Sequence, residues 1–230
     1  MAYTHRGSAT NIIVGAASLF TYEGPDGLGG DLQVADLPAY EAGKSFRESL
    51  QDGATANNGW LSTDGFRNVG YTSNGIELQF QPDFGEVKVD QILDVAKLYK
   101  QGMQVNLKTS FAEATLENLL FSIAAPTSDL SDLVAIGVAA GSQELNLSAG
   151  QIGECPVERG LVAVGPGTGD CAAGSSIERI YTAFRALSIE SVTVSAKRDE
   201  ATMFEVSFRL LPNDEGSYGK IVDRIIPAAS

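Results

Sequence analysis

The chain has 230 residues, of which 43% are hydrophobic, and this length fits one medium-sized domain with a buried core. Its 29 acidic residues outnumber the 16 basic ones, which gives a formal net charge of −13. Because phosphate contacts come from Lys and Arg, this balance argues against tight binding of DNA or RNA.

Signals for export, membrane insertion and disulfide bonding are weak. The first residues lack the charged and then apolar pattern of a secretory signal, so we expect synthesis in the cytosol. The apolar run from Ile12 to Phe20 is too short, and too interrupted by glycine, to span a bilayer. Cys155 and Cys171 are predicted to be free thiols, because two cysteines make no disulfide framework in a domain of this size.

A polar arm at residues 1–10 precedes a first predicted strand, Asn11–Tyr22, and residues 36–67 then form a long, weakly patterned loop. Loops of this length usually carry a function or are disordered. This one ends near Trp60, the only tryptophan, whose ring needs an apolar surface to bury against. That surface is either its own domain or a neighbouring molecule.

The central block is predicted to be three strands and a helix. Apolar and polar residues alternate in Ile76–Pro82, Glu86–Gln91 and Met103–Phe111, whereas Leu116, Leu119, Leu120 and Ile123 follow the helical spacing within Ala112–Ile123. A turn is expected after Pro82, and Pro126 is expected to mark the end of the helix. One face of the three strands is therefore expected to pack on the core and the other, the wet face, to contact solvent. This arrangement is typical of an antiparallel sheet. The residues of the wet face are Glu77, Gln79, Glu86, Lys88, Asp90, Gln104, Asn106 and Lys108.

The last hundred residues are predicted to hold an irregular insertion, three further strands and a C-terminal arm. Residues 125–176 are the insertion, within which Ser142–Leu147 and Arg159–Val164 are short strand candidates. Further along, Arg179–Arg185, Ser188–Ser195 and Thr202–Leu211 have strand character. The arm, residues 212–230, carries Ile221, Val222, Ile225 and Ile226, and so many aliphatic residues near a terminus need a packing partner.

Motifs for catalysis and cofactor binding were sought and are missing from the sequence. His5 is the only histidine, and it lies on the polar arm, where a Ser-His-Asp group is not expected. The glycines at 165, 167 and 169 lack the Gly-Lys-Ser/Thr of a phosphate loop, and the two cysteines have no nearby His to complete a zinc site. We therefore expect no enzyme activity and no cofactor or metal.

Three segments of the central block, in this order and spacing, resemble the tail tube (major tail) proteins of long-tailed bacteriophages. They are Gly65-Phe-Arg-Asn-Val-Gly-Tyr-Thr-Ser-Asn-Gly-Ile-Glu-Leu78, Val87-Lys-Val-Asp-Gln91 and Ala112-Glu-Ala-Thr-Leu-Glu-Asn-Leu-Leu120. The resemblance covers roughly residues 60–125, and Ser188–Leu211 fits the final hairpin of that family in character. Residues 125–176 match no pattern of the family.

The resemblance implies a mainly β fold, an antiparallel β-sandwich or barrel-like domain with one flanking α-helix and a long loop. It also implies a structural virion protein, of which six copies form a ring and the rings stack into a tube for genome ejection. Implied partners are further copies of the chain and the tape-measure, tail-terminator and distal tail proteins, with DNA passing through unbound. The wet strand face then supplies candidate lumen residues. Candidate contacts between rings are Trp60, Ile221, Val222, Ile225 and Ile226.

Two other readings of the sequence stay open. The first is the inner tube of a contractile injection or type VI secretion system, which shares the ring but carries protein. The second is a capsid-decorating or carbohydrate-binding β-sandwich, which favours exposed aromatic residues clustered on one face.

Overall fold

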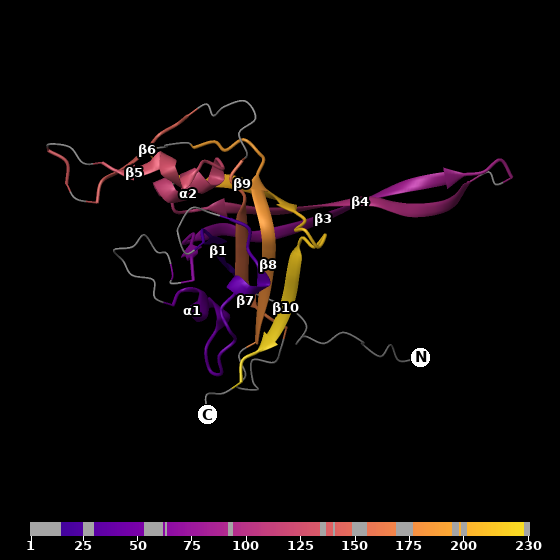
Figure 1. The fold of residues 1–230 in the computed structure, drawn as a ribbon, viewed down its shortest axis with the longest axis horizontal. Coiled ribbons are helices and arrows are strands. Elements are labelled where there is room, and N and C mark those ends of the chain that lie inside the picture. The colour runs from indigo at the N-terminus through magenta and orange to yellow at the C-terminus, as the bar shows by residue number, and fades with distance from the viewer. Residues whose placement is uncertain are drawn as a thin grey trace.

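The computed structural model describes residues 15–24, 30–52, 62, 64–91, 94–133, 137–139, 141–148, 156–168, 177–194, 198 and 202–227. Antiparallel strands make up most of this part of the chain, as the sequence predicted (Figure 1). The strands are β1 Ser18–Tyr22, β2 Phe66–Asn68, β3 Thr72–Lys88, β4 Val95–Phe111, β5 Leu130–Asp132, β6 Gln143–Leu145, β7 Arg159–Pro166, β8 Ile177–Ser188, β9 Phe204–Leu211 and β10 Gly219–Ile225. The helices are α1 Phe46–Leu50 and α2 Leu116–Ser122, with 3-10 turns at Val34–Asp36 and Thr127–Asp129.

One large sheet has the strand order β2-β1-β7-β8-β9-β4-β3, and β10 adds to β8. One edge of β8 pairs with β7, while its other edge pairs first with β10, from Ile177 to Ala183, and then with β9, from Arg185 to Ser188. The sheet therefore divides at β8 into a part β2-β1-β7-β8-β10 and a part β9-β4-β3. In Figure 1, β3 and β4 run across the direction of β7, β8 and β10. The described strands close no barrel, so the barrel-like expectation is wrong.

A first core fills the space between these two parts of the sheet. It joins Leu161 and Ala183 of β7 and β8 to Leu107 and Phe208 of β4 and β9, all of them buried. Phe121 of α2 closes one end of this core, with its ring centroid 4.7 Å from that of Phe208. Helix α2 thus flanks the sheet, as predicted.

A second core lies on the other face of β1, β7 and β8, beneath the segment predicted as a long loop at residues 36–67. This segment contains the short helix α1, so the prediction of an unstructured loop is wrong for residues 46–50. Ser45 and Glu48 form a capping box, which satisfies free backbone N–H groups at the first turn. Phe46 and Leu50, four residues apart on one helix face, are fully buried in this core. Trp60 lies outside the described residues.

Residues 125–176 do not form one irregular insertion. Strands β5 and β6 make a small separate sheet, and the predicted strand at Ser142–Leu147 is confirmed as β6. The predicted strand at Arg159–Val164 is confirmed as β7, but β7 lies in the middle of the large sheet between β1 and β8. Both of its faces are covered, and residues 159–164 are all buried. A strand covered on both faces lacks polar–apolar alternation, which is why the pattern did not reveal its central position.

Strands β3 and β4 form one long hairpin, so the predicted turn after Pro82 is wrong. Strand β3 runs through Pro82, which lies opposite Met103 in the register, and the reversal comes after Lys88. Pro82 cannot donate a backbone hydrogen bond, and it is tolerated because β3 is the last strand in the sheet order. Asn74 and Gly75 form a bulge within β3 and both have positive φ angles, 62° and 69°.

Helix α2 is shorter than the predicted Ala112–Ile123. Its N-cap is Thr115, whose side chain accepts a hydrogen bond from the Asn118 backbone, and the chain turns at Ala124 (φ 54°), two residues before Pro126. The predicted stripe is only partly buried, because Ile123 is exposed while Asn118 and Ser122 are buried. Hydrogen bonds therefore hold this helix as much as apolar packing does.

At the C-terminal end, residues 219–225 form strand β10 on β8, so this part of the chain is no free arm. The predicted strands at Arg179–Arg185 and Thr202–Leu211 are confirmed as β8 and β9. The prediction at Ser188–Ser195 is wrong for residues 189–194, which are not strand. The arm at residues 1–10 and both cysteines lie outside the described residues. No helix among the described residues has the length and apolar character needed to cross a membrane.

Candidate assembly surface

The outer half of the β3–β4 hairpin projects beyond the rest of the molecule (Figure 1). Strand β9 pairs with β4 only from Val105 to Phe111, so no third strand among those described pairs with the hairpin beyond that point. Phe80, Phe84 and Leu98 are between 53% and 60% exposed on it. Exposed apolar side chains that gather on one element are typical of interaction sites.

A bulge fixes the geometry of the hairpin where it leaves the body. The register shifts between Asp83 and Phe84, after which Phe84 pairs with Lys100 and Gly85 with Tyr99. Gly85 is buried beneath the side chain of Tyr99, and a Cβ atom added there would lie 2.6 Å from Tyr99 Cζ. With glycine at this position, the ring of Tyr99 can cross directly over the backbone, whereas a larger residue would displace it.

The apolar face of the hairpin continues from the first core to its outer half. Alternation along β3 places Leu78, Phe80 and Phe84 on the same face, since side chains two residues apart point the same way. Leu98 joins this face because it pairs with Glu86, which follows Phe84 at the same spacing. These residues form a stripe, of which Leu78 is partly buried on the first core and the outer members are exposed.

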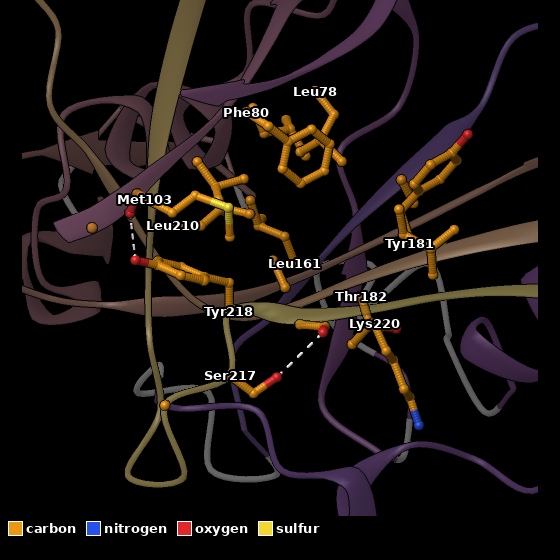
Figure 2. A pocket seen from close by; sticks show the side chains of 18 of the residues that line it. Leu78, Phe80, Met103, Leu161, Tyr181, Thr182, Leu210, Ser217, Tyr218 and Lys220 are labelled. Atoms are coloured by element: carbon orange, nitrogen blue, oxygen red, sulfur yellow. Dashed lines mark hydrogen bonds between the residues drawn. The ribbon is translucent and has the colours of Figure 1, made fainter. Parts of the chain in front are cut away.

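An open cleft of about 610 Å³ lies between the root of the hairpin and strands β7, β8 and β10. Figure 2 shows Leu78 and Phe80 on one side of it and Leu161 and Tyr181 on the other. The hydroxyl of Tyr218 donates a hydrogen bond to the backbone carbonyl of Met103, which ties the segment before β10 to the hairpin. The cleft is lined mainly by apolar side chains, with the polar groups of Lys100, Ser217 and Lys220 among them.

A second cavity of about 480 Å³ adjoins this cleft and shares Leu78, Phe80, Tyr181 and Ile221 with it. Its far side is formed by Gly15, Ala17 and the Gly165–Pro166 end of β7. Together the two cavities make one apolar groove beneath the hairpin. A groove of this kind suits the side chains of a protein segment.

Five of the eight predicted wet-face residues lie on one face of the hairpin. Glu77 pairs with Lys108 and Gln79 with Asn106, and residues paired across an antiparallel ladder share a face. Gln104 follows at the same alternation and donates a hydrogen bond to Asn106. This face continues onto β9 through Ser207 and Arg209, which pair with Lys108 and Asn106. The predicted polar face is therefore present over this part of the hairpin, but Asn106 on it is buried and does not face solvent.

Glu86 and Lys88 do not belong to that face. Because β3 continues without a turn at Pro82, its alternation is unbroken and places both on the side of Phe84. Asp90 lies in the turn beyond β3 and is exposed. The prediction that all eight residues share one face is wrong for these three.

The predicted inter-ring residues differ in their surroundings. Ile221 and Ile225 are 52% and 64% exposed on β10, whereas Val222 packs against the second core. Ile226 lines a shallow cavity beside Ser45 at the start of α1. Trp60 lies outside the described residues. Only Ile221 and Ile225 thus offer large exposed side chains.

A charged pair joins β8 and β10 at the edge of the groove. The guanidinium of Arg179 donates two hydrogen bonds to the carboxylate of Asp223, one of them 2.6 Å long. This bidentate contact lowers the pKa of Asp223 below its ordinary value of 3.8. Among the described residues, no three His, Cys, Asp or Glu side chains are grouped so as to hold a metal ion.

Sequence reasoning missed the outer hairpin as a surface feature. It assigned Phe80 to the core face, and it gave Phe84, Leu98 and Tyr99 no role. Phe84 fell in the predicted turn after Pro82, and Leu98 and Tyr99 fell in the connection before Met103, so no strand alternation was assigned to them.

No protein-family model matches this chain, and no curated protein sequence matches it.

Proposed function

We propose that this chain is a structural subunit that assembles with copies of itself into stacked hexameric rings, and that these rings form the tail tube of a long-tailed bacteriophage. The observation that carries the proposal is the projecting hairpin, with its exposed apolar stripe and the open groove at its root. An unpaired edge strand and uncovered apolar surface are hazards for a monomer, and they suit a subunit whose neighbours cover them.

The segments that carry the family resemblance also support this proposal, because two of them are in contact. The backbone N–H of Tyr71, from the first segment, donates a 2.8 Å hydrogen bond to Glu113 of the third. Gly70 has a φ of +83° and lies against the same carboxylate, where a Cβ atom has no room. Asn118 also binds the carbonyl of Val69 at 2.8 Å. A shared structural junction is a physical reason for such motifs to occur together.

In this proposal the two parts of the large sheet are the layers of a β-sandwich, and the polar face of β3, β4 and β9 lines the tube. That face carries acidic and basic residues, Glu77 and Glu205 beside Lys108 and Arg209. A surface without excess positive charge lets DNA slide without adhering. The tape-measure, tail-terminator and distal tail proteins are the proposed partners within the virion, which would be assembled in the host cytoplasm.

Negative-stain electron microscopy of the purified, concentrated protein tests the proposal. We expect rings or tubes of constant bore, with sixfold symmetry in end views. A protein that stays monomeric in sedimentation velocity across a wide concentration range, and forms no polymer on preformed tail tips, would contradict it.

A further inference from the structure

Each part of the large sheet extends past the region where the two parts cover one another. The hairpin extends beyond the first core, so that Phe84 and Leu98 of its stripe are 53% and 60% exposed. We call these two residues the outer stripe. They lie on the same face as Leu78, which packs on the first core. The outer stripe therefore belongs to one layer of the sandwich, at a place where the described residues of the other layer do not cover it.

Strands β8 and β10 extend in the same way beyond the cover of the hairpin. Tyr181 and Ile221 pair across the two strands, and Ile225 follows on the same face, four residues after Ile221. Ile221 and Ile225 are more than half exposed, and Tyr181 is partly buried. We call these three residues the open face. They border the groove, which contains both Tyr181 and Ile221.

The outer stripe does not reach the open face of its own chain. Phe80 lines the groove, and Phe84 lies four residues further along the same extended strand, about 13 Å further out at 3.3 Å per residue. Strand β3 has no turn there, the bulge after Asp83 places its extra residue on β4, and the hairpin projects away from β8 and β10 (Figure 1). Within the described part of the chain, the two surfaces therefore do not meet one another.

We propose that the outer stripe of one copy packs on the open face of the next copy, so that the two overhanging layers complete a sandwich between subunits. Both surfaces occur on every chain and they are different patches, which makes the contact heterologous. Heterologous contacts produce rings when the rotation closes and filaments when it does not. The inference rests on the proposed function and names the surfaces that join neighbouring subunits.

Charge around the two surfaces is compatible with this contact. Glu86 and Lys100 flank the outer stripe as the cross-strand partners of Leu98 and Phe84. On the open face, the Arg179–Asp223 pair lies between Ile221 and Ile225. Because each side carries both signs among its apolar residues, charged groups of opposite sign can meet alongside the apolar contact.

Cysteine cross-linking between two separately purified variants tests this contact. Both are made in a background with Cys155→Ser and Cys171→Ser; one carries Phe84→Cys and the other Ile221→Cys. The substituted positions are exposed, so both variants are expected to fold, and circular dichroism verifies this. After co-assembly and treatment with a short bismaleimide, we expect a covalent dimer in the mixture and little in either variant alone. Leu98→Cys with Ile225→Cys is a second pair with the same expectation.

Val87→Cys mixed with Ile221→Cys is the matched control. Val87 is exposed on the same strand but lies on the opposite face from Phe84, so this mixture should give little cross-linked dimer. Tubes that form without a bond between the outer stripe and the open face would overturn this inference and leave the proposed function standing. Equal cross-linking of either variant with itself would overturn it too, because the contact would then be isologous. Absence of any assembly by the parent protein would overturn both.

Discussion

Arg159 is the largest fully buried side chain among the described residues, and Glu23 is its ion-pair partner. Its Nε atom lies 2.9 Å from Glu23 Oε2, and Arg67 approaches the other oxygen of the same carboxylate at 3.8 Å. Arg67 also donates a hydrogen bond to Asn118, and burial lowers the pKa of its guanidinium. A single carboxylate thus lies between two buried cations and joins β1, β2, β7 and α2.

Replacing Glu23 with Gln should therefore destabilise the monomer strongly. The substitution removes the carboxylate that pairs with both Arg159 and Arg67, and breaking such a buried pair costs about 3–5 kcal/mol. Urea denaturation gives the free energy of unfolding of both proteins. Glu86→Gln is the control, since Glu86 is exposed and its loss should cost less than about 0.5 kcal/mol. A Glu23→Gln variant as stable as the parent would show that the cluster contributes nothing to folding.

The Arg179–Asp223 pair should give β10 a stability that depends on pH. Since the pKa of Asp223 is lowered by its hydrogen bonds to Arg179, the contribution is complete above 3.8 and is lost as the pH falls through the pKa of the folded state. The parent should have a higher denaturation midpoint than Asp223→Asn at pH 7, and this difference should shrink below pH 3.8. A difference that grew on acidification would contradict the assignment, and Asp90→Asn serves as an exposed control.

Among the secondary-structure elements, the β3–β4 hairpin has two halves with different roles: the inner half stabilises the fold, and the outer half is proposed for assembly. Its inner half contributes Val105, Leu107 and Leu78 to the first core, whereas most side chains from Phe84 to Gln101 are exposed. The outer half therefore adds little to the stability of the monomer. Its conformation depends on cross-strand pairing and on Tyr99 crossing Gly85.

Removing the outer half should abolish assembly and leave the subunit folded. Asp83 and Gly102 are paired in the register, so residues 84–101 can be replaced by an Asn-Gly turn. The free energy of unfolding should change by less than about 1 kcal/mol, because few buried contacts are lost. Sedimentation velocity and thermal denaturation measure the two effects. Assembly that persists in this variant would exclude the hairpin as an interface element.

For the whole molecule, the net charge of −13 opposes contact between copies. Repulsion between exposed charges weakens as salt shortens the Debye length from about 30 Å at 0.01 M to about 8 Å at 0.15 M. Apolar contacts such as that between the outer stripe and the open face are not weakened by the same screening.

Assembly should consequently increase with salt. Light scattering at fixed protein concentration should show more polymer at about 0.15 M than at about 0.01 M NaCl, because the Debye length is shorter. Duplex DNA added in parallel should show no binding by fluorescence anisotropy. Polymer that dissolves as salt rises would indicate that charge complementarity, and not apolar burial, holds the subunits together.

The predictability of the fold differs from element to element. Alternation in Met103–Phe111 and Thr202–Leu211 revealed β9 and the inner part of β4, because polar and apolar residues alternate along both segments, although Asn106 and Ser207 are buried. Strand β7 and helix α1 gave little signal, since β7 is covered on both sides and α1 has only five residues. Pro82 misled the prediction, because an edge strand tolerates a proline that a central strand excludes. For the candidate surface, the polar face at Glu77, Gln79, Gln104, Asn106 and Lys108 was predicted and the apolar outer stripe was not.

By itself the sequence determined the local periodicities: which residues alternate, which follow the helical spacing, and that the chain is acidic. These depend on neighbours a few residues apart. Only the tertiary structure decided that β3 continues past Pro82, that β10 adds to β8, and that the two parts of the sheet overhang one another. The physical reason is that strand order and the extent of mutual cover depend on residues distant in sequence. The exposed side chains of Phe84, Leu98, Ile221 and Ile225 are a consequence of that arrangement.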